Sequence, residues 1–148
     1  MIDLQKVCYA YEHEVALRYI DLHIEKGDSL VIQGPNGCGK STLINIIANR
    51  IFADEGEILI DNLSAKENMQ VHEKIFCMSE ADLYDTSLKI KDHFKWINRF
   101  YNSFDLNKAL EISEKFNLDT SKRFKALSKG YQSIFKLTVA LSLNVPYV

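Results

Sequence analysis

Nine residues, GPNGCGKST at positions 34–42, combine three glycines, a lysine and two hydroxyl side chains. Glycine permits backbone angles that other residues resist and lets the main chain approach a ligand closely. The amides of residues 37–42 can therefore point toward phosphate oxygens. Lys40 supplies a positive charge for the outer phosphates, and the Ser41 hydroxyl is a suitable Mg²⁺ ligand. The sequence thus predicts a phosphate-binding site made of Gly34, Pro35, Asn36, Gly37, Cys38, Gly39, Lys40, Ser41 and Thr42.

The segments on either side of this loop are typical of a phosphate-binding loop. The loop fits the pattern G-x-x-x-x-G-K-[S/T], in which an apolar strand precedes the glycines and a helix follows them. Residues 29–33 form a short apolar run that predicts the strand, and apolar positions within 40–51 recur at helical spacing. A helix that begins near Lys40 adds free N–H groups and the positive end of its dipole. Because both a strand and a helix are predicted in these places, a glycine-rich turn that contains a lysine by chance is disfavoured.

The rest of the chain predicts strands first and helices later. Strands are expected over residues 2–9, 16–24, 58–60 and 75–78. After about residue 86 the apolar spacing becomes helical over 90–104, 109–116 and 130–143. The last of these is apolar nearly all round and is expected to be buried. Strands that alternate with helices behind an antiparallel start predict an α/β fold.

Composition narrows the class of protein. The 148 residues suit one soluble domain, because 47% are hydrophobic and 26% are charged. A net charge of −2 offers no large basic face, so nucleic-acid binding is not expected. No apolar run approaches the ~20 residues that span a bilayer. The three cysteines lack C-x-x-C spacing, so zinc and disulfides are not indicated, and a reducing cytosol is the simpler location.

A second motif indicates the family. About 85 residues after the loop comes LSKGYQ, residues 127–132, which resembles the signature LSGGQ of ATP-binding cassette (ABC) ATPases. The loop itself resembles their usual GPNGAGKST. This resemblance covers the whole chain. It implies a P-loop NTPase fold with an N-terminal antiparallel β part, a partial RecA-like core and a helical subdomain at about 81–143. ATP and Mg²⁺ are the implied cofactors.

The resemblance also implies roles for further residues. Tyr11 corresponds to the aromatic that stacks on adenine, with Tyr9 as the competing candidate. Glu80 stands where the family places the Gln-loop glutamine, so Ser41 and Glu80 are the implied metal ligands. In the family, the signature faces the γ-phosphate of ATP held by a second subunit, which assigns that role to Leu127, Ser128, Lys129 and Gly130.

The signature departs from the usual pattern at two positions. Lys129 replaces its first glycine and Tyr131 its glutamine, and LSKG is a common variant among ATPases of small bacterial exporters. Ser128 also lies just before an apolar helix, where serine is a good N-cap.

Partners follow from the same resemblance. The family pairs two ATPase subunits head to tail and docks the helical subdomain on membrane-spanning transporter subunits. The expected location is therefore cytoplasmic, at the inner face of the cell membrane. Trp96 and Phe100 widen the apolar arc of the predicted helix 90–104, and packing within the subdomain is favoured over a docking patch for them.

The end of the sequence bears on hydrolysis. SLNVPYV, residues 142–148, resembles the start of the strand that carries the Walker B aspartate in the family. The aspartate, the glutamate that polarises water, the D-loop and the switch histidine would all follow it. Because hydrolysis needs positioned water and stabilised charge, we expect this chain to bind ATP without hydrolysing it. No catalytic residue is assigned, Lys40 being supporting, and the chain is interpreted as an N-terminal or truncated part of the ATPase.

Three other interpretations remain. A non-catalytic nucleotide-binding or regulatory module fits the missing Walker B region. A soluble ABC ATPase acting on the ribosome or DNA is disfavoured, because such proteins usually carry two cassettes or large insertions. A P-loop kinase or GTPase would leave LSKGYQ without a function.

Overall fold

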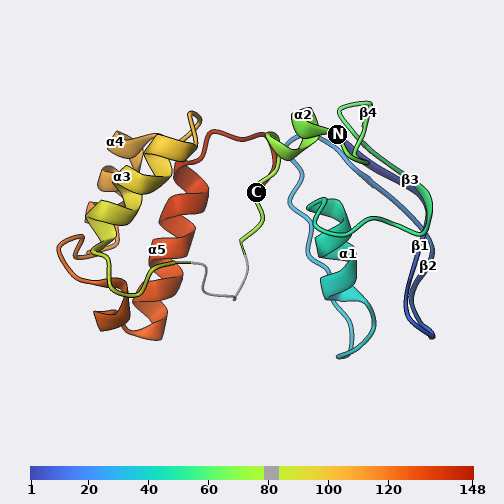
Figure 1. Cartoon of the computed structure of the whole chain (residues 1–148), viewed down its shortest axis with the longest axis horizontal. Coiled ribbons are helices and arrows are strands. Elements are labelled where there is room, and N and C mark those ends of the chain that lie inside the picture. Colours follow the sequence, from blue (N-terminus) through green and yellow to red (C-terminus); the bar gives the residue numbers. More distant parts are fainter. Residues whose placement is uncertain (79–83) are drawn as a thin grey trace. The chain divides into compact units, whose positions relative to one another are not determined.

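The computed structural model describes residues 1–78 and 84–148. The chain divides into two compact parts, Met1–Ile75 (unit 1) and Phe76–Val148 (unit 2). Unit 1 contains the strands and the phosphate-loop segment, whereas unit 2 is helical (Figure 1). No helix in the described ranges is long and apolar enough to cross a membrane.

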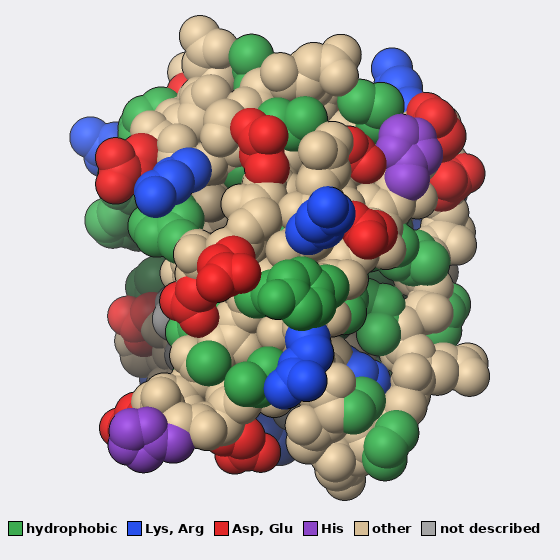
Figure 2. Space-filling view, turned by 90° about the vertical axis from the view of Figure 1, so that its right-hand side faces the viewer, with side chains coloured by type: hydrophobic (Ala, Val, Ile, Leu, Met, Phe, Trp, Pro, Cys, Tyr) green, Lys and Arg blue, Asp and Glu red, His purple; other side chains and the backbone are tan. Residues whose placement is uncertain are grey.

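Unit 1 is built on a four-stranded antiparallel sheet. Its strands are β1 (Ile2–Tyr11), β2 (Glu14–Ile24), β3 (Glu55–Ile60) and β4 (Leu63–Ser64), in the order β2-β1-β3-β4. The expected strands at 2–9, 16–24 and 58–60 are therefore present, and each is longer than expected. Figure 2, which views the molecule from the side of this sheet, shows acidic and basic side chains interspersed rather than one charged expanse.

Two irregularities shape the β1–β2 hairpin. Lys6 and Tyr19 have left-handed backbone angles, with φ of 50° and 48°, at shifts in the strand register. The Lys6 amide donates to Asp21 at 2.8 Å, and the Tyr19 amide donates to the Cys8 sulfur at 3.2 Å. A bulge inserts an extra residue and so resets the alternation of side chains. This explains why strand residues three apart, Leu4 and Val7 on either side of Lys6, are both buried.

Helix α1 (Lys40–Ile47) packs against β2 and completes the core of unit 1. It ends before the expected residue 51, because Asn49 adopts a left-handed conformation with φ of 55°. The buried Asn49 side chain donates to the Ala65 carbonyl oxygen at 2.7 Å. A short helix, α2 (Met69–His72), begins at Asn68, whose side chain accepts from the Gln70 amide. The apolar core of unit 1 comprises Ile2, Leu4, Val7, Leu17, Ile46, Ile60, Ala65 and Val71.

Two expected strands are not formed. Residues 29–33 adopt no regular structure, so the prediction of a short apolar strand there was wrong, and Leu30 and Val31 are exposed. A strand needs a neighbour for its backbone hydrogen bonds, and none of the described strands pairs with this segment. Residues 75–78 likewise form no strand. Within unit 2, the Phe76 amide donates to the Tyr147 carbonyl oxygen at 2.9 Å.

Unit 2 packs three helices around aromatic side chains. They are α3 (Ile90–Phe100), α4 (Leu106–Lys115) and α5 (Lys129–Ser142), with a 3-10 turn, η1 (Phe124–Ala126), before α5. Segments 86–91 and 120–125 are joined by backbone hydrogen bonds, including a bridge between Lys89 and Arg123. The buried core comprises Ile90, Phe94, Phe104, Ala109, Leu118, Phe124, Leu127, Phe135, Val139 and Leu143.

The predicted burial of the last helix was only half right. Phe135 and Val139 lie in the core, but Leu137 and Leu141 are 38% and 43% exposed. Residues four apart share a helix face, so these two leucines mark the face of α5 that unit 2 does not cover. Helix α3 also ends earlier than expected, at Phe100, because Tyr101 is extended.

Candidate functional site: a phosphate loop and a signature segment

The predicted phosphate loop leads directly into a helix. Gly39 is the N-cap of α1, and Lys40 is its first residue. Because the N-cap is a glycine, no side chain caps the helix, and the amides of its first turn have no partner within the helix. Residues 34–38 and Ser41 are exposed, whereas Thr42 is buried. The expected helix is thus present after the loop, and its open N-terminus favours an anion.

Two glycines are required by the path of the loop. Gly37 and Gly39 have φ of +83° and +89°, in the region that side chains disfavour. A Cβ atom on Gly39 would also lie 2.5 Å from the Ala16 carbonyl oxygen in β2. One on Gly34 would lie 2.7 Å from the Cys38 sulfur, within the loop itself. The loop is therefore closely packed at both ends. Gly34 lies against Cys38 within the loop, and Gly39 lies against β2.

The lysine lies over this loop. Lys40 Nζ donates to the carbonyl oxygens of Gly34 at 2.8 Å and Pro35 at 2.6 Å. It also lies 3.9 Å from the Cys38 sulfur. The Cys38 amide donates to the Pro35 carbonyl oxygen at 3.4 Å. The side chain spans the loop and places one positive charge among its exposed backbone groups.

Tyr11 lies beside the start of α1. The Thr42 hydroxyl donates to the Tyr11 hydroxyl at 3.4 Å, although the two residues are 31 positions apart. Tyr11 is 49% exposed, and its ring packs edge-on against that of Tyr9, with centroids 4.9 Å apart. Tyr11 therefore presents an accessible aromatic face next to the loop. The residue types did not predict the contacts with Tyr9 and Thr42, although the i, i+2 spacing of the tyrosines within a strand indicates a shared face.

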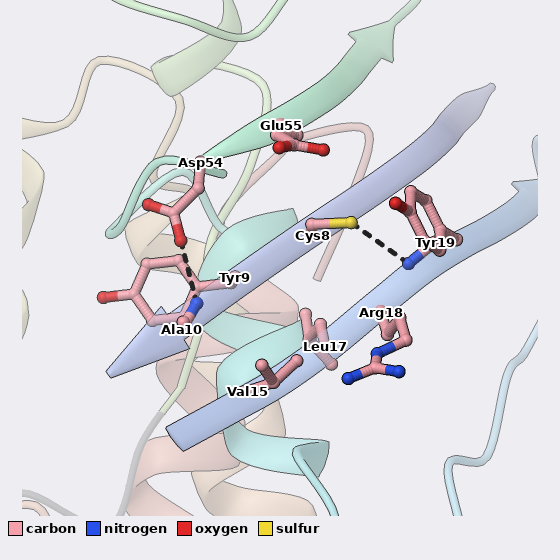
Figure 3. Close-up of a pocket in the computed structure, with 9 residues that line it drawn as sticks. All are labelled: Cys8, Tyr9, Ala10, Val15, Leu17, Arg18, Tyr19, Asp54 and Glu55. Carbon is pink, nitrogen blue, oxygen red and sulfur yellow. Dashed lines mark hydrogen bonds between the residues drawn. The ribbon is translucent and has the colours of Figure 1, made fainter. Parts of the chain in front are cut away.

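A hollow lies on the β1–β2 hairpin near its contact with β3. It has a volume of about 340 Å³ and is lined by Cys8, Tyr9, Ala10, Val15, Leu17, Arg18, Tyr19, Asp54 and Glu55. Figure 3 shows Asp54 reaching the Ala10 amide, a 2.8 Å hydrogen bond, and Cys8 reaching the Tyr19 amide. The lining contains no residue of the phosphate loop. Phosphate loops bind through exposed backbone amides rather than through deep cavities, so the loop remains the candidate site.

The signature segment forms the start of α5 in unit 2. Ser128 is the N-cap, and its Oγ accepts from the Tyr131 amide at 3.4 Å, so the predicted cap is confirmed. Leu127 is buried in the core, and Gln132 donates to its carbonyl oxygen at 3.3 Å. Lys129 and Gly130 are exposed. The segment is held from behind by the core and presents its serine, lysine and glycine outward.

Gly130 is not required by the path of its own chain. Its φ is not left-handed, and the nearest atom to an added Cβ would be Ser128 Oγ at 4.0 Å. The backbone here would accept alanine. A need for glycine at this position would therefore have to come from a molecule outside unit 2.

The metal prediction is divided between two regions. Ser41 is exposed at the start of α1, where its hydroxyl is accessible. Glu80 lies outside the described residues. Within residues 1–78 and 84–148, no three acidic, histidine or cysteine side chains are grouped so as to hold a metal ion. Of the two predicted metal ligands, Ser41 is therefore the one that lies among the described residues.

The predicted packing of Trp96 and Phe100 was wrong. Trp96 and Phe100 on α3 were expected to pack within the helical part of the chain, but they are 54% and 66% exposed. Their rings stack on each other, with centroids 5.3 Å apart and planes at 20°. The core side of α3 is already filled by Ile90, His93 and Phe94, so the wide apolar arc exceeds what unit 2 buries.

Two histidines that the motifs did not involve differ in environment. Burial lowers the pKa of His93, whose Nε2 contacts the Asp85 carbonyl oxygen at 2.9 Å among aromatic rings. Hydrogen bonds with Glu25 at 2.7 Å and Asp3 at 3.2 Å raise the pKa of exposed His23. Neither residue lies in the loop or the signature. Their shifted pKa values make the stability of each unit depend on pH in an opposite sense.

Comparison with known proteins identifies the family. Residues 17–148, which include both the loop and the signature, match the family model described as "ABC transporter". The chain belongs to the ABC transporter family. Its sequence is 29% identical over 142 residues to the ABC transporter ATP-binding protein YtrB of Bacillus subtilis, covering 96% of the chain and 49% of that protein. It is 30% identical to the cytochrome c biogenesis ATP-binding export protein CcmA of Reclinomonas americana, covering 89% of the chain and 61% of that protein.

Solved structures confirm the predicted α/β ABC ATPase fold with an antiparallel N-terminal sheet. A putative ABC transporter ATP-binding protein from Pyrococcus furiosus superposes with a TM-score of 0.84 at 27% identity, covering 97% of this chain and 71% of that one. The ATP-binding cassette MJ0796, solved as a dimer bound to ADP and Pi, gives a TM-score of 0.82 at 26% identity, with coverages of 99% and 71%. This ABC chain spans about half the length of YtrB.

Proposed function

We propose that the chain is the ATP-binding subunit of an ABC transporter, which couples ATP binding and hydrolysis to transport across a membrane. The observation that carries this proposal is the loop at residues 34–42. It is an exposed, glycine-dependent turn that opens an uncapped helix and is spanned by a lysine ammonium. Such a helix N-terminus binds phosphate through backbone N–H groups and its dipole.

Each polar group has a role in this proposal. The amides at the start of α1 hold the β- and γ-phosphates, and Lys40 exchanges its two carbonyl partners for phosphate oxygens. Ser41 ligates Mg²⁺, which the nucleotide brings with it. Glu80 is proposed as a second Mg²⁺ ligand from sequence position alone. Tyr11 stacks on the adenine ring, an interaction that its exposed face allows.

The signature is proposed to act on a second subunit's nucleotide. Ser128, Lys129 and Gly130 are presented outward at the start of α5, which gives another helix N-terminus for a γ-phosphate. The solved MJ0796 cassettes are dimers, and a head-to-tail pair would bring each signature to the partner's loop. Membrane-spanning subunits complete the proposed transporter, at the cytoplasmic face of the membrane. The LSKG signature favours the small-exporter type.

For the polypeptide of residues 1–148, we propose nucleotide binding without turnover. No catalytic base is assigned among its residues, and no group is assigned to polarise the attacking water. Phosphoryl transfer depends on such positioned groups. The helical part of the ABC domain is proposed to lie at about 81–143.

The test is a pair of measurements on one preparation. We expect a fluorescent ATP analogue to bind in the presence of Mg²⁺, with affinity reduced about a hundredfold in Lys40→Ala, because a charge-assisted contact to phosphate is lost. Lys26→Ala removes an exposed lysine elsewhere in unit 1 and is the matched control. Phosphate release should be absent. Equal affinity in Lys40→Ala and wild type would contradict the proposed site, and Lys40-dependent phosphate release would contradict the absence of turnover.

A further inference from the structure

Helix α3 (Ile90–Phe100) has a face that unit 2 leaves uncovered. Ile90, His93 and Phe94 are buried on one side of the helix. The opposite arc contains two stripes of exposed residues at helical spacing, one basic and one aromatic. Exposed lysine, arginine and tryptophan side chains are enriched at the interface between membrane and water.

The basic stripe consists of Lys91, Lys95 and Arg99. These residues are four apart and therefore lie in line along the helix, and all three are exposed. Asp92 is the one acid within α3, and it lies 3.6 Å from Lys95. Because a single carboxylate accompanies three cations, the stripe keeps a net positive charge.

The charge continues beyond the first turn of α3. Lys89 precedes the helix and forms a backbone bridge with Arg123, and paired residues project their side chains from the same side. Both are exposed, whereas the next residues, Ile90 and Phe124, are buried. Two further cations therefore face outward at the start of the helix.

The aromatic stripe consists of Trp96 and Phe100. They lie one turn apart, on the other side of Asp92 from the basic stripe. Their rings stack, and the two residues are 54% and 66% exposed. Tryptophan with neighbouring lysine and arginine is favoured at the boundary between lipid headgroups and acyl chains. Helix α4 provides the contrast, because its two lysines are balanced by two glutamates, with Lys115 and Glu111 paired at 2.7 Å.

We propose that the outer face of α3, formed by Lys91, Lys95, Arg99, Trp96 and Phe100, binds the surface of an anionic lipid bilayer. The cations contact headgroup phosphates, and the two rings enter the headgroup region. Charge selects the anionic class, and the stacked aromatic pair favours a lipid interface over a soluble polyanion. This goes beyond the proposed transporter function, since it assigns lipid contact to the ATP-binding chain itself and needs no nucleotide.

The chain contains its own reporter. Trp96 is the only tryptophan in the sequence, so its fluorescence reports on this surface without labelling. We expect a blue shift and increased intensity when nucleotide-free protein is mixed with vesicles containing about one third phosphatidylglycerol, and no change with pure phosphatidylcholine. Raising KCl to about 0.5 M should reverse the shift, because exposed charges are screened.

Matched charge variants test the residues. The triple variant Lys91→Gln/Lys95→Gln/Arg99→Gln should lower the vesicle partition coefficient about a hundredfold. The control Lys26→Gln/Lys66→Gln/Lys108→Gln removes three exposed cations elsewhere and should lower it less than about threefold. Phe100→Ser, which retains the reporter, should weaken binding several-fold, whereas Leu110→Ser on α4 should not. Circular dichroism verifies that each variant is folded.

Three outcomes would overturn the proposal: no binding to anionic vesicles, equal loss in both triple variants, or displacement of the protein from vesicles by a small excess of RNA. The last would assign the surface to nucleic acid. Because Lys40 is unchanged, ATP binding by the same variants shows separately whether the proposed function holds. A variant that binds ATP normally but not vesicles would support lipid contact as a property of α3 alone.

Discussion

The starts of α1 and α5 both lie where phosphate chemistry is predicted, but they are built differently. α1 follows Gly39, which has no side chain to cap it. α5 follows Ser128, which caps its own helix. The first arrangement leaves backbone donors for an external anion, whereas the second partly satisfies them internally. We therefore expect the start of α1 to bind phosphate through its glycine-dependent backbone and Lys40. We expect the start of α5 to contribute to a partner's site through a helix end that Ser128 already stabilises.

The largest expected effect is in the phosphate loop. Gly39→Ala should lower the free energy of unfolding by about 3 kcal/mol, because a left-handed alanine is strained and its methyl group would meet the Ala16 carbonyl oxygen at 2.5 Å. Urea denaturation followed by circular dichroism measures this. Gly37→Ala is the control, because its φ is also positive but nothing lies within 4 Å, and it should cost about 1 kcal/mol. Equal losses would show that contact with the sheet is unimportant.

A smaller effect is expected on nucleotide affinity from the neighbouring aromatic. Tyr11→Ala should weaken ATP binding about tenfold through lost stacking, and Tyr11→Phe should stay within about twofold, because the 3.4 Å bond from Thr42 is long. Titration with a fluorescent ATP analogue gives both values. If Tyr9→Ala loses affinity while Tyr11→Ala does not, then Tyr9 is the stacking residue.

The signature serine should affect stability rather than binding in the isolated chain. Ser128→Ala removes the cap of α5 and should lower the free energy of unfolding by about 1 kcal/mol, while the chain's own ATP affinity stays unchanged. Ser133→Ala is the control, because that hydroxyl only bonds back to the Lys129 carbonyl oxygen at 3.1 Å within the helix. Reduced ATP affinity in Ser128→Ala, measured on a monomeric sample, would mean that both helix starts serve one nucleotide in one chain.

The smallest effect distinguishes the units by pH. Burial lowers the pKa of His93, so the unfolded chain binds more protons at mildly acidic pH. Above the ordinary histidine pKa of about 6.5 burial of the neutral ring carries no ionisation cost, and stability is lost as the pH falls from there through the lower pKa of the folded state. His23 has the opposite sign, since its raised pKa stabilises unit 1 below about 6.5 and loses this as the pH rises. Unfolding of His93→Gln and His23→Gln across this range should show opposite changes in slope, and parallel changes would refute the assignment.

Local signals predicted much of the fold and of the local structure around the candidate site. The strands at 2–9 and 16–24, the helix after the loop and the serine cap all follow from spacing and residue type within a few positions. The strand expected at 29–33 failed for a non-local reason. Leu30 and Val31 have the right apolarity, but strand formation depends on a hydrogen-bonded neighbour that no described strand provides.

The remaining features depended on tertiary contacts. The residue types do not predict the bulges at Lys6 and Tyr19. The irregularity at Lys6 is the reason that Leu4 and Val7 are both buried. The apolar spacing predicted helix α3 correctly, but the predicted packing of Trp96 was wrong. A sequence shows how wide an apolar helix face is, but not how much of that face is covered by the rest of the protein.

The hydrogen bond from the Phe76 amide to the Tyr147 carbonyl oxygen brings two positions of unit 2 together that are far apart in the sequence. A segment whose two ends lie close together can be lengthened or exchanged without rerouting the chain on either side of it. Closing such a long loop costs little more entropy than closing one half as long. A change in length between residues 76 and 147 is therefore expected to leave the path of the phosphate loop unchanged.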